Sequence, residues 1–332
     1  MKKTLLAIAL LSCSTSALAI KDGTAVDWSK NDDMVKMNCT GTLIAGKWVL
    51  TAAHCSKNAP QGVSTVNNGR FTATANNYPA GGPIALDIGL WQLNGVPDTH
   101  AIQFLSMRNV EEGEHIRITG FGAGVGLQDL AYAEQIAIPP TEGRPEWLTL
   151  KFTGNGQTIG GDSGAPYTDA DGLIIGVSTH GGIDHETGEQ ASGSRLSYAK
   201  DFILEHINAW HYPTVANTPT NGGTITVKVQ SLHIDSVVDN ATASGDATIT
   251  GGTCSGAIVN SFDICSYDVA SNGYEGTVTL DDNQTITINK GRTKPVTPPT
   301  PDPETGSSGG GSLGFLSLLS LLGLGLLRVK QK

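Results

Sequence analysis

Short runs of hydrophobic and β-branched residues recur along most of the chain, and turns rich in Gly, Asn and Pro separate them. Runs of this kind are typical of β-strands. They cover residues 41–50, 84–93, 115–119 and 173–179, and further along 224–229, 247–250, 276–280 and 285–288. Between the two sets, apolar residues at three- and four-residue spacing over 198–210 indicate a helix. The pattern therefore predicts an all-β protein with a helix between two groups of strands.

The spacing of these runs divides the chain into two β-rich parts. The longer part covers residues 20–212 and the shorter part residues 224–293. A segment rich in Pro, Thr, Asn and Gly, 213–223, is expected to link them, and a Pro-, Gly- and Ser-rich linker, 294–312, follows. The shorter part has the size of a small β-sandwich, for which an immunoglobulin-like fold is one candidate.

Residues 1–19 have the features of a secretory signal peptide in the expected order. Two lysines come first, an apolar stretch follows, and a small-residue cleavage site ends at Ala19. We therefore expect an exported protein whose mature chain begins at Ile20. A lipoprotein signal ending at Cys13 is the alternative, and Leu11 fits that pattern poorly.

An uncharged Leu- and Gly-rich run occupies residues 313–327, and three basic residues follow it. Such a run is at the short end for a membrane span, and its basic flank indicates a cytoplasmic end. We therefore expect residues 313–332 to form a transmembrane tail. A buried core helix is the alternative, but the run has no polar face and follows a flexible linker.

Composition favours a turn-rich β protein, because the 332 residues include 42 glycines and only 6% aromatic residues. The formal net charge is −10. Five of the 21 basic residues lie in the two terminal segments, which leaves 16 against 31 acidic residues in the body. Nucleic acid is therefore not expected as a partner, because binding it requires a basic surface.

Four of the five cysteines form two local pairs, Cys39 with Cys55 and Cys254 with Cys265. The fifth, Cys13, lies in the predicted signal peptide. An even number of cysteines in an exported chain indicates disulfides. A zinc site is the alternative, which the wide separation of the pairs disfavours.

Two short motifs contain the residue types of nucleophilic catalysis. A strand-like run over residues 48–55 ends in Ala-Ala-His-Cys and delivers His54, and a histidine is a suitable general base near neutral pH. The second motif, Gly-Gly-Asp-Ser-Gly-Ala-Pro over 160–166, contains Ser163. Its glycines permit a tight turn that presents backbone N–H groups.

An aspartate between the two motifs is needed to orient the histidine. Asp87 stands between Leu86 and Ile88, and a buried carboxylate with apolar neighbours suits that role. Asp98 follows a proline in a turn-like segment and is expected to be solvated. Asp87 is therefore the better candidate.

Together these motifs resemble those of the trypsin-like (chymotrypsin-type) serine endopeptidases. The order His54, Asp87, Ser163 is that of the chymotrypsin class. The segments 119–122 and 176–178 also resemble the family, and the likeness extends over roughly residues 20–210. It implies a fold of two six-stranded β-barrels and hydrolysis of peptide bonds in proteins or peptides, with no cofactor or metal.

The resemblance also implies a role for each site residue. Ser163 would be the nucleophile, His54 the base and then the acid, and Asp87 the group that orients His54. The N–H groups of Gly161 and Ser163 would form the oxyanion hole. Ala165 stands where the family usually has glycine, which is a small change.

Members of this family become active when cleavage exposes a new N-terminal isoleucine, whose ammonium pairs with the aspartate beside the nucleophile. Here Ile20 follows the predicted signal site directly, and Asp162 precedes Ser163. We therefore expect signal peptidase itself to create the activating N-terminus. Alternatively, Ile20 is only the first core residue.

Substrate preference follows less directly from the resemblance. The residue six before the nucleophile lies at the base of the family's primary pocket, and here it is Gln157, which carries no charge. Thr158 and His180 are candidate pocket residues for a polar or acidic side chain, and Ser178 lies on the strand that pairs with substrate. A strictly basic P1 preference (the residue before the cleaved bond) is therefore not expected.

The C-terminal segment resembles the GlyGly-type sorting signal of Gram-negative bacteria, because small residues at 306–312 precede the short span and its basic end. The resemblance implies removal of the tail by a rhomboid-like protease and passage through type II secretion. The protein is then expected in the medium or at the cell surface. An uncleaved inner-membrane anchor is the alternative.

Two rival functions have different sequence requirements. A non-catalytic surface adhesin with a protease fold would be expected to lack a triad residue or an oxyanion glycine, and this chain has them all. In a glycan-binding role, the 224–293 part would be the functional unit. That part has no aromatic stripe, and Tyr267 and Tyr274 alone do not indicate a sugar site.

Overall fold

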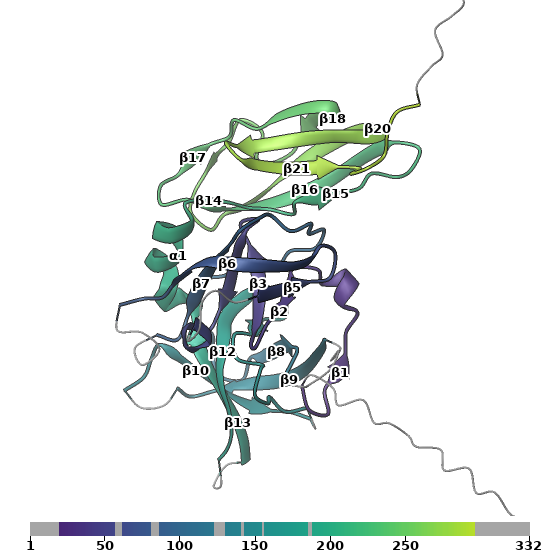
Figure 1. Cartoon of the computed structure of the whole chain (residues 1–332). Helices are drawn as coiled ribbons and strands as arrows, with labels where there is room; N and C mark the ends of the chain where they lie inside the picture. Colours follow the sequence, from purple (N-terminus) through teal and green to yellow (C-terminus); the bar gives the residue numbers. More distant parts are fainter. Residues whose placement is uncertain are drawn as a thin grey trace, which may run out of the picture. The chain divides into compact units, whose positions relative to one another are not determined.

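A computed structural model describes residues 20–56, 62–80, 86–122, 130–140, 143–154, 156–184 and 188–295. Two closed six-stranded β-barrels are followed by a further β-sheet domain (Figure 1). The all-β prediction and the double barrel are therefore confirmed. The predicted signal peptide and transmembrane tail lie outside the described residues, and among the described residues no helix has the length and apolar character to cross a membrane.

The first barrel delivers the histidine and aspartate of the site. Its strands are β2 (Met34–Lys36), β3 (Thr40–Ile44), β4 (Trp48–Thr51), β5 (Gly62–Thr65), β6 (Gly69–Asn77) and β7 (Gly89–Leu93). They close in the order β2-β3-β4-β7-β6-β5. Val49, Leu90 and Trp91 are fully buried in its core, which fixes β4 beside β7. Both of these strands adjoin a predicted catalytic residue.

The second barrel delivers the serine. Its strands are β8 (His115–Gly120), β9 (Ala131–Ile138), β10 (Trp147–Phe152), β11 (Pro166–Thr168), β12 (Ile174–Asp184) and β13 (Gly188–Arg195). A short strand, β1 (Thr24–Ala25), pairs with β9. Ile20 belongs to the core of this barrel together with Ile118 and Leu150. The predicted first residue of the mature chain is therefore a core residue.

Helical structure is confined to short segments among the described residues. Three 3₁₀ helices cover Trp28–Lys30, Ala53–Ser56 and Leu196–Ala199, and the α-helix α1 covers Lys200–Ile207. The helix predicted over 198–210 is thus shorter than expected. Asn208 adopts a left-handed conformation with φ 40° and closes the helix. Trp210, the expected last helical residue, lies instead in a strand, where it is buried.

The C-terminal domain consists of a six-stranded sheet and a two-stranded ribbon. The sheet contains β14 (Ala209–His211), β15 (Val215–Ala216), β16 (Gly223–Leu232), β18 (Thr242–Gly251), β20 (Ile264–Asp281) and β21 (Gln284–Ile288), and the ribbon pairs β17 (Val237–Val238) with β19 (Ile258–Val259). Its core includes Val229, Tyr267 and Ile286. Strand β15 pairs with β21, so the segment predicted as a linker, 213–223, also takes part in the sheet.

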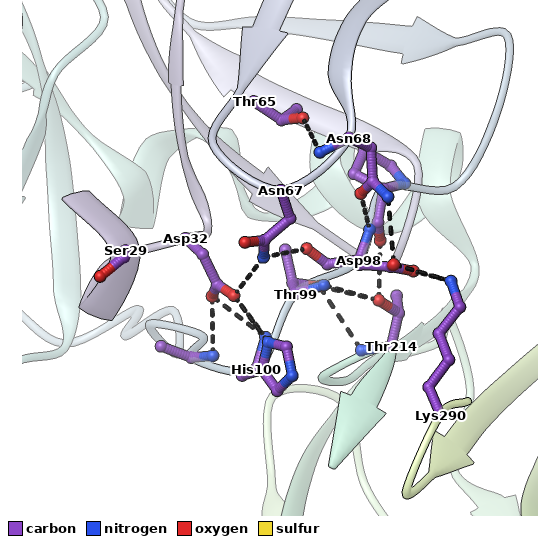
Figure 2. Close-up of polar contacts among 12 residues, drawn as sticks. Ser29, Asp32, Thr65, Asn67, Asn68, Asp98, Thr99, His100, Thr214 and Lys290 are labelled. Carbon is purple, nitrogen blue, oxygen red and sulfur yellow. Dashed lines mark hydrogen bonds and ion pairs between the residues drawn. The ribbon is translucent and has the colours of Figure 1, made fainter. Parts of the chain in front are cut away.

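Hydrogen bonds join this sheet to the first barrel and to the segment that follows β7. Lys290 donates to the Asp98 carboxylate at 2.7 Å, and the Thr99 N–H donates to the Thr214 hydroxyl at 2.8 Å (Figure 2). The Gln230 side-chain amide both donates to and accepts from the Leu105 backbone. Asp98 was expected to be solvated, but its carboxylate takes part in this network because the turn containing it faces the C-terminal sheet.

Candidate active site

His54 and Asp87 form a close pair in the first barrel. His54 lies on the 3₁₀ helix that follows β4, and Asp87 lies two residues before β7, the strand paired with β4. The His54 Nδ1 is 2.6 Å from the Asp87 carboxylate, and the His54 backbone N–H donates to the same carboxylate at 2.8 Å. Asp87 is buried, and its own N–H donates to the Ser194 hydroxyl. These bonds fix the orientation of the His54 ring, and Nε2 is the ring nitrogen that Asp87 does not engage.

The disulfide between Cys39 and Cys55 fastens the segment around His54 to the start of β3. The second predicted disulfide, between Cys254 and Cys265, is also present. The Cys39 and Cys55 sulfurs lie within 4.8 Å of a His54 ring nitrogen. Both sulfurs are consumed in the disulfide, so this group does not have the thiolate ligands that a zinc site needs.

Ser163 lies in a tight turn before β11. The Asp162 N–H donates to the Ile159 carbonyl at 3.1 Å, and the Gly164 N–H donates to the Ser178 carbonyl at 2.7 Å. Gly164 has φ 84°, and a Cβ there would lie 2.2 Å from the Thr40 carbonyl oxygen. Only glycine fits this position, because both the backbone conformation and the space exclude a side chain.

The Ser163 hydroxyl is half-exposed and donates to the Thr179 carbonyl at 3.5 Å, a long hydrogen bond. In the described part of the chain, no hydrogen bond joins Ser163 to His54. Nucleophile and base are often looser in the free enzyme than in a substrate complex. The N–H groups of Gly161 and Ser163 donate to no backbone carbonyl among the described residues, so both are available to a ligand.

Asp162 is a buried carboxylate inside this turn. Its side chain accepts hydrogen bonds from the N–H groups of Ile159 and Gly122, both at 2.8 Å. Burial raises the pKa of Asp162 to about 7, although the two hydrogen bonds lower it. Among the described residues, no Lys, Arg or His forms a salt bridge with it. Ile20, its predicted partner, shares a core cluster with Ala165.

The predicted pocket residues have different surroundings. The Thr158 hydroxyl is buried and lies against Gly181, and it has no hydrogen-bond partner among the described residues. His180 is exposed, and its ring centre is 6.1 Å from that of His54. Gln157 instead pairs with the N-terminal segment, because its N–H donates to the Lys21 carbonyl at 2.8 Å.

Ser178 braces the nucleophile turn through its backbone. Its carbonyl accepts from Gly164, and its N–H donates to the Ala165 carbonyl at 2.8 Å. Its hydroxyl is buried and accepts from the Tyr167 hydroxyl at 3.3 Å. The side chain of Ser178 is thus occupied within the barrel.

Sequence reasoning missed two residues that support the site. Ser194 bonds the Asp87 backbone from β13, and Thr40 bonds the nucleophile turn from β3. Thr40 adjoins Cys39 in the histidine motif, which was the only available signal. Ser194 had none, because its contact with Asp87 spans 107 positions in sequence.

Comparison with known proteins gives a consistent result for the barrel part. Residues 21–203 match the family model described as Trypsin. The chain is 28% identical over 204 residues to a collagenase of Hypoderma lineatum, which covers 52% of this chain and 78% of that protein. It is 26% identical over 164 residues to an uncharacterized peptidase of Corynebacterium glutamicum, with 44% of this chain and 56% of that protein covered. The chain thus spans little more than half of the latter relative.

Solved structures with a similar chain path include neuropsin, a serine protease expressed in the limbic system of mouse brain. The match has a TM-score of 0.48 and 19% identity, and it covers 56% of this chain and 99% of that chain. Human heparin binding protein matches with a TM-score of 0.48 and 20% identity over 55% of this chain and 94% of that chain.

Proposed function

The chain belongs to the trypsin family of serine-type peptidases, and we propose that it is an exported endopeptidase with His54, Asp87 and Ser163 as its catalytic triad. The observation that carries this proposal is the double contact between His54 and Asp87, one through Nδ1 at 2.6 Å and one through the backbone N–H at 2.8 Å. A carboxylate held in this way fixes the imidazole tautomer that a general base requires.

The reaction follows from these groups. The Ser163 Oγ attacks the carbonyl carbon of the peptide bond while His54 Nε2 takes its proton. The negative oxygen of the tetrahedral intermediate accepts hydrogen bonds from the N–H groups of Gly161 and Ser163. His54 then gives the proton to the leaving amine, and an acyl-enzyme on Ser163 remains. Water, deprotonated by His54, hydrolyses this ester and restores the serine.

The P1 preference proposed here is for polar or acidic residues, not strictly for Lys or Arg. The support is chemical, because Gln157 has no charge and the buried Thr158 hydroxyl has no partner among the described residues. His180 is exposed beside His54 and is able to contact a substrate carboxylate. A buried donor without a partner favours a substrate that supplies one.

Activation is proposed to depend on cleavage before Ile20. The new ammonium would pair with Asp162, a buried carboxylate whose partners among the described residues are N–H donors. Burial of Ile20 in the second barrel supports this proposal, because it holds the start of the mature chain in the core that adjoins the nucleophile turn. Signal peptidase would be the activating enzyme.

The proposed route ends outside the cell. Residues 1–19 would direct export, and the 313–332 tail would be a transient anchor, removed by a rhomboid-like protease before type II secretion. Mass spectrometry of the secreted protein tests both ends. A mature form that begins at Ile20 and lacks the span supports the route, and a secreted form that keeps the span contradicts it.

The central test is cleavage of a peptide library varied at P1 by purified protein that begins at Ile20. Ser163→Ala is the matched control, because it removes one oxygen from the site. Cleavage by the wild type alone supports the proposed chemistry, and the preferred residue reports on Thr158 and His180. No cleavage by either protein would favour a binding protein that retains the fold.

A further inference from the structure

Thr40, the first residue of β3, contacts the nucleophile turn twice. Its N–H donates to the Ser163 carbonyl at 2.9 Å, and its hydroxyl donates to the Gly161 carbonyl at 3.0 Å. The side chain is fully buried. One residue therefore holds the carbonyl groups of both residues whose N–H groups are the proposed oxyanion donors.

The Thr40 hydroxyl is itself held in orientation. The Phe121 N–H donates to it at 3.0 Å, and a hydroxyl has a single proton, which leaves that proton for the Gly161 carbonyl. The next residue, Gly122, donates to the Asp162 carboxylate. Two successive N–H groups after β8 thus support the turn, one directly and one through Thr40. Hydrogen bonds in such a chain strengthen one another.

We propose that Thr40 is a positioning residue for the oxyanion hole, an inference that rests on the proposed function. Gly161 has φ 97°, and a glycine has the widest freedom to rotate its flanking peptides. Oxyanion donors act through preorganisation, so a rotated peptide costs rate. The Thr40 hydroxyl anchors the Gly161 carbonyl and thereby limits the rotations that are open to Gly161.

Thr42 provides a matched control on the same strand. It lies two positions after Thr40, so its side chain points to the same face of β3. It is 1% exposed, and its hydroxyl bonds only the Met34 sulfur, at 3.8 Å, among the described residues. Thr42→Val therefore removes a buried hydroxyl from the same strand without changing the nucleophile turn.

The experiment compares Thr40→Val, Thr40→Ser and Thr42→Val in the protein that begins at Ile20. We expect Thr40→Val to lower kcat for a peptide substrate about 10- to 100-fold with KM within about threefold, because loss of one oxyanion donor itself costs about 10²–10³-fold. Thr40→Ser keeps the hydroxyl and should restore kcat to within about threefold. Thr42→Val should resemble the wild type in kcat.

Thermal unfolding separates this effect from a loss of structure. If Thr40→Val does not fold, Thr40→Ala and Thr40→Ser replace it, since both lack the methyl group and only serine has the hydroxyl. The proposal is overturned if Thr40→Val, or Thr40→Ala in its place, has the same kcat as Thr40→Ser. It is also overturned if Thr42→Val loses as much kcat as Thr40→Val. An active wild type with that result leaves the proposed function intact. An inactive wild type refutes the proposed function and the role of Thr40 with it.

Discussion

Burial of Asp162 predicts how residues kept in front of Ile20 change the stability and activity of the protein. The Asp162 carboxyl group is 1% exposed, and the N–H groups of Ile159 and Gly122 are its partners. Burial raises the pKa of Asp162 to about 7 from an ordinary 3.8. A form of the protein that keeps Leu18 and Ala19 has no ammonium at Ile20 and should retain this raised pKa.

The sign and size of the effect follow from proton linkage. A carboxyl with a raised pKa in the folded state binds its proton more tightly there, so its stabilising contribution is present below pH 3.8 and lost as pH rises towards 7. The shift from 3.8 to about 7 corresponds to about 4 kcal/mol at 1.36 kcal/mol per unit. In the form that begins at Ile20, the ammonium stabilises the charged state of Asp162, so stability is not lost as pH rises towards 7.

Chemical denaturation of the two forms between pH 4 and pH 8 measures the difference directly. We expect nearly equal stability at pH 4 and an advantage for the Ile20 form that grows to about 4 kcal/mol at pH 8. Burial also raises the pKa of Asp33 to about 7, but Asp33 is present in both forms, and its contribution cancels. Activity at pH 8 should also be higher in the Ile20 form, because there the charged Asp162 carboxylate has a counter-ion.

Two results would refute this reasoning. A stability difference that does not change with pH would mean that Asp162 does not titrate between the two forms. Equal activity of both forms at pH 8 would mean that the turn needs no ammonium. Asp162→Asn in the Leu18 form is the control, because the amide has no charge and should abolish the pH dependence of the stability difference from the Ile20 form.

Three further predictions concern other parts of the protein. Asp87→Asn should lower kcat by about 10⁴-fold in a peptide assay, because the amide favours the wrong tautomer of His54; a loss below tenfold contradicts the triad. His180→Ala should reduce the kcat/KM ratio of P1-Glu to P1-Leu peptides by at most about fivefold, because an exposed ion pair contributes about 1 kcal/mol or less, and an unchanged ratio removes His180 from the pocket. Lys290→Met should cost about 0.5 kcal/mol in urea denaturation by breaking the pair with Asp98, less at high salt; a salt-independent cost would show another cause.

Local patterns predicted the all-β class, because strand-like runs follow from alternation along a few residues. The double barrel was implied by the resemblance of the motifs around His54 and Ser163 to the trypsin-like family, and the turn around Ser163 needs glycine at fixed positions. The two disulfides were also predictable, since each joins cysteines 16 or 11 positions apart. These features are visible within one short stretch of chain.

Contacts between distant stretches were not predictable in this way. The end of α1 depends on Asn208 and on burial of Trp210 in the C-terminal sheet, whereas helical spacing continues past Asn208 as far as Trp210. Asp98 looked like a solvated turn residue, but Lys290 lies 192 positions further on and pairs with it. The role of Thr40 was not predictable for the same reason, because its hydroxyl bonds a residue 121 positions away.

The supports of the nucleophile turn indicate what activation has to supply. Thr40 holds the turn from the first barrel, Ser178 from β12, and the N–H groups of Ile159 and Gly122 hold Asp162. The donors are N–H groups and one hydroxyl, the acceptors are backbone carbonyls and the Asp162 carboxylate, and none of these contacts includes an ammonium. The described structure already contains them with Asp162 buried and no cation paired to it. A new N-terminus at Ile20 would therefore supply one positive charge, and the turn would not have to rearrange. Activity would then fall at high pH as the ammonium loses its proton.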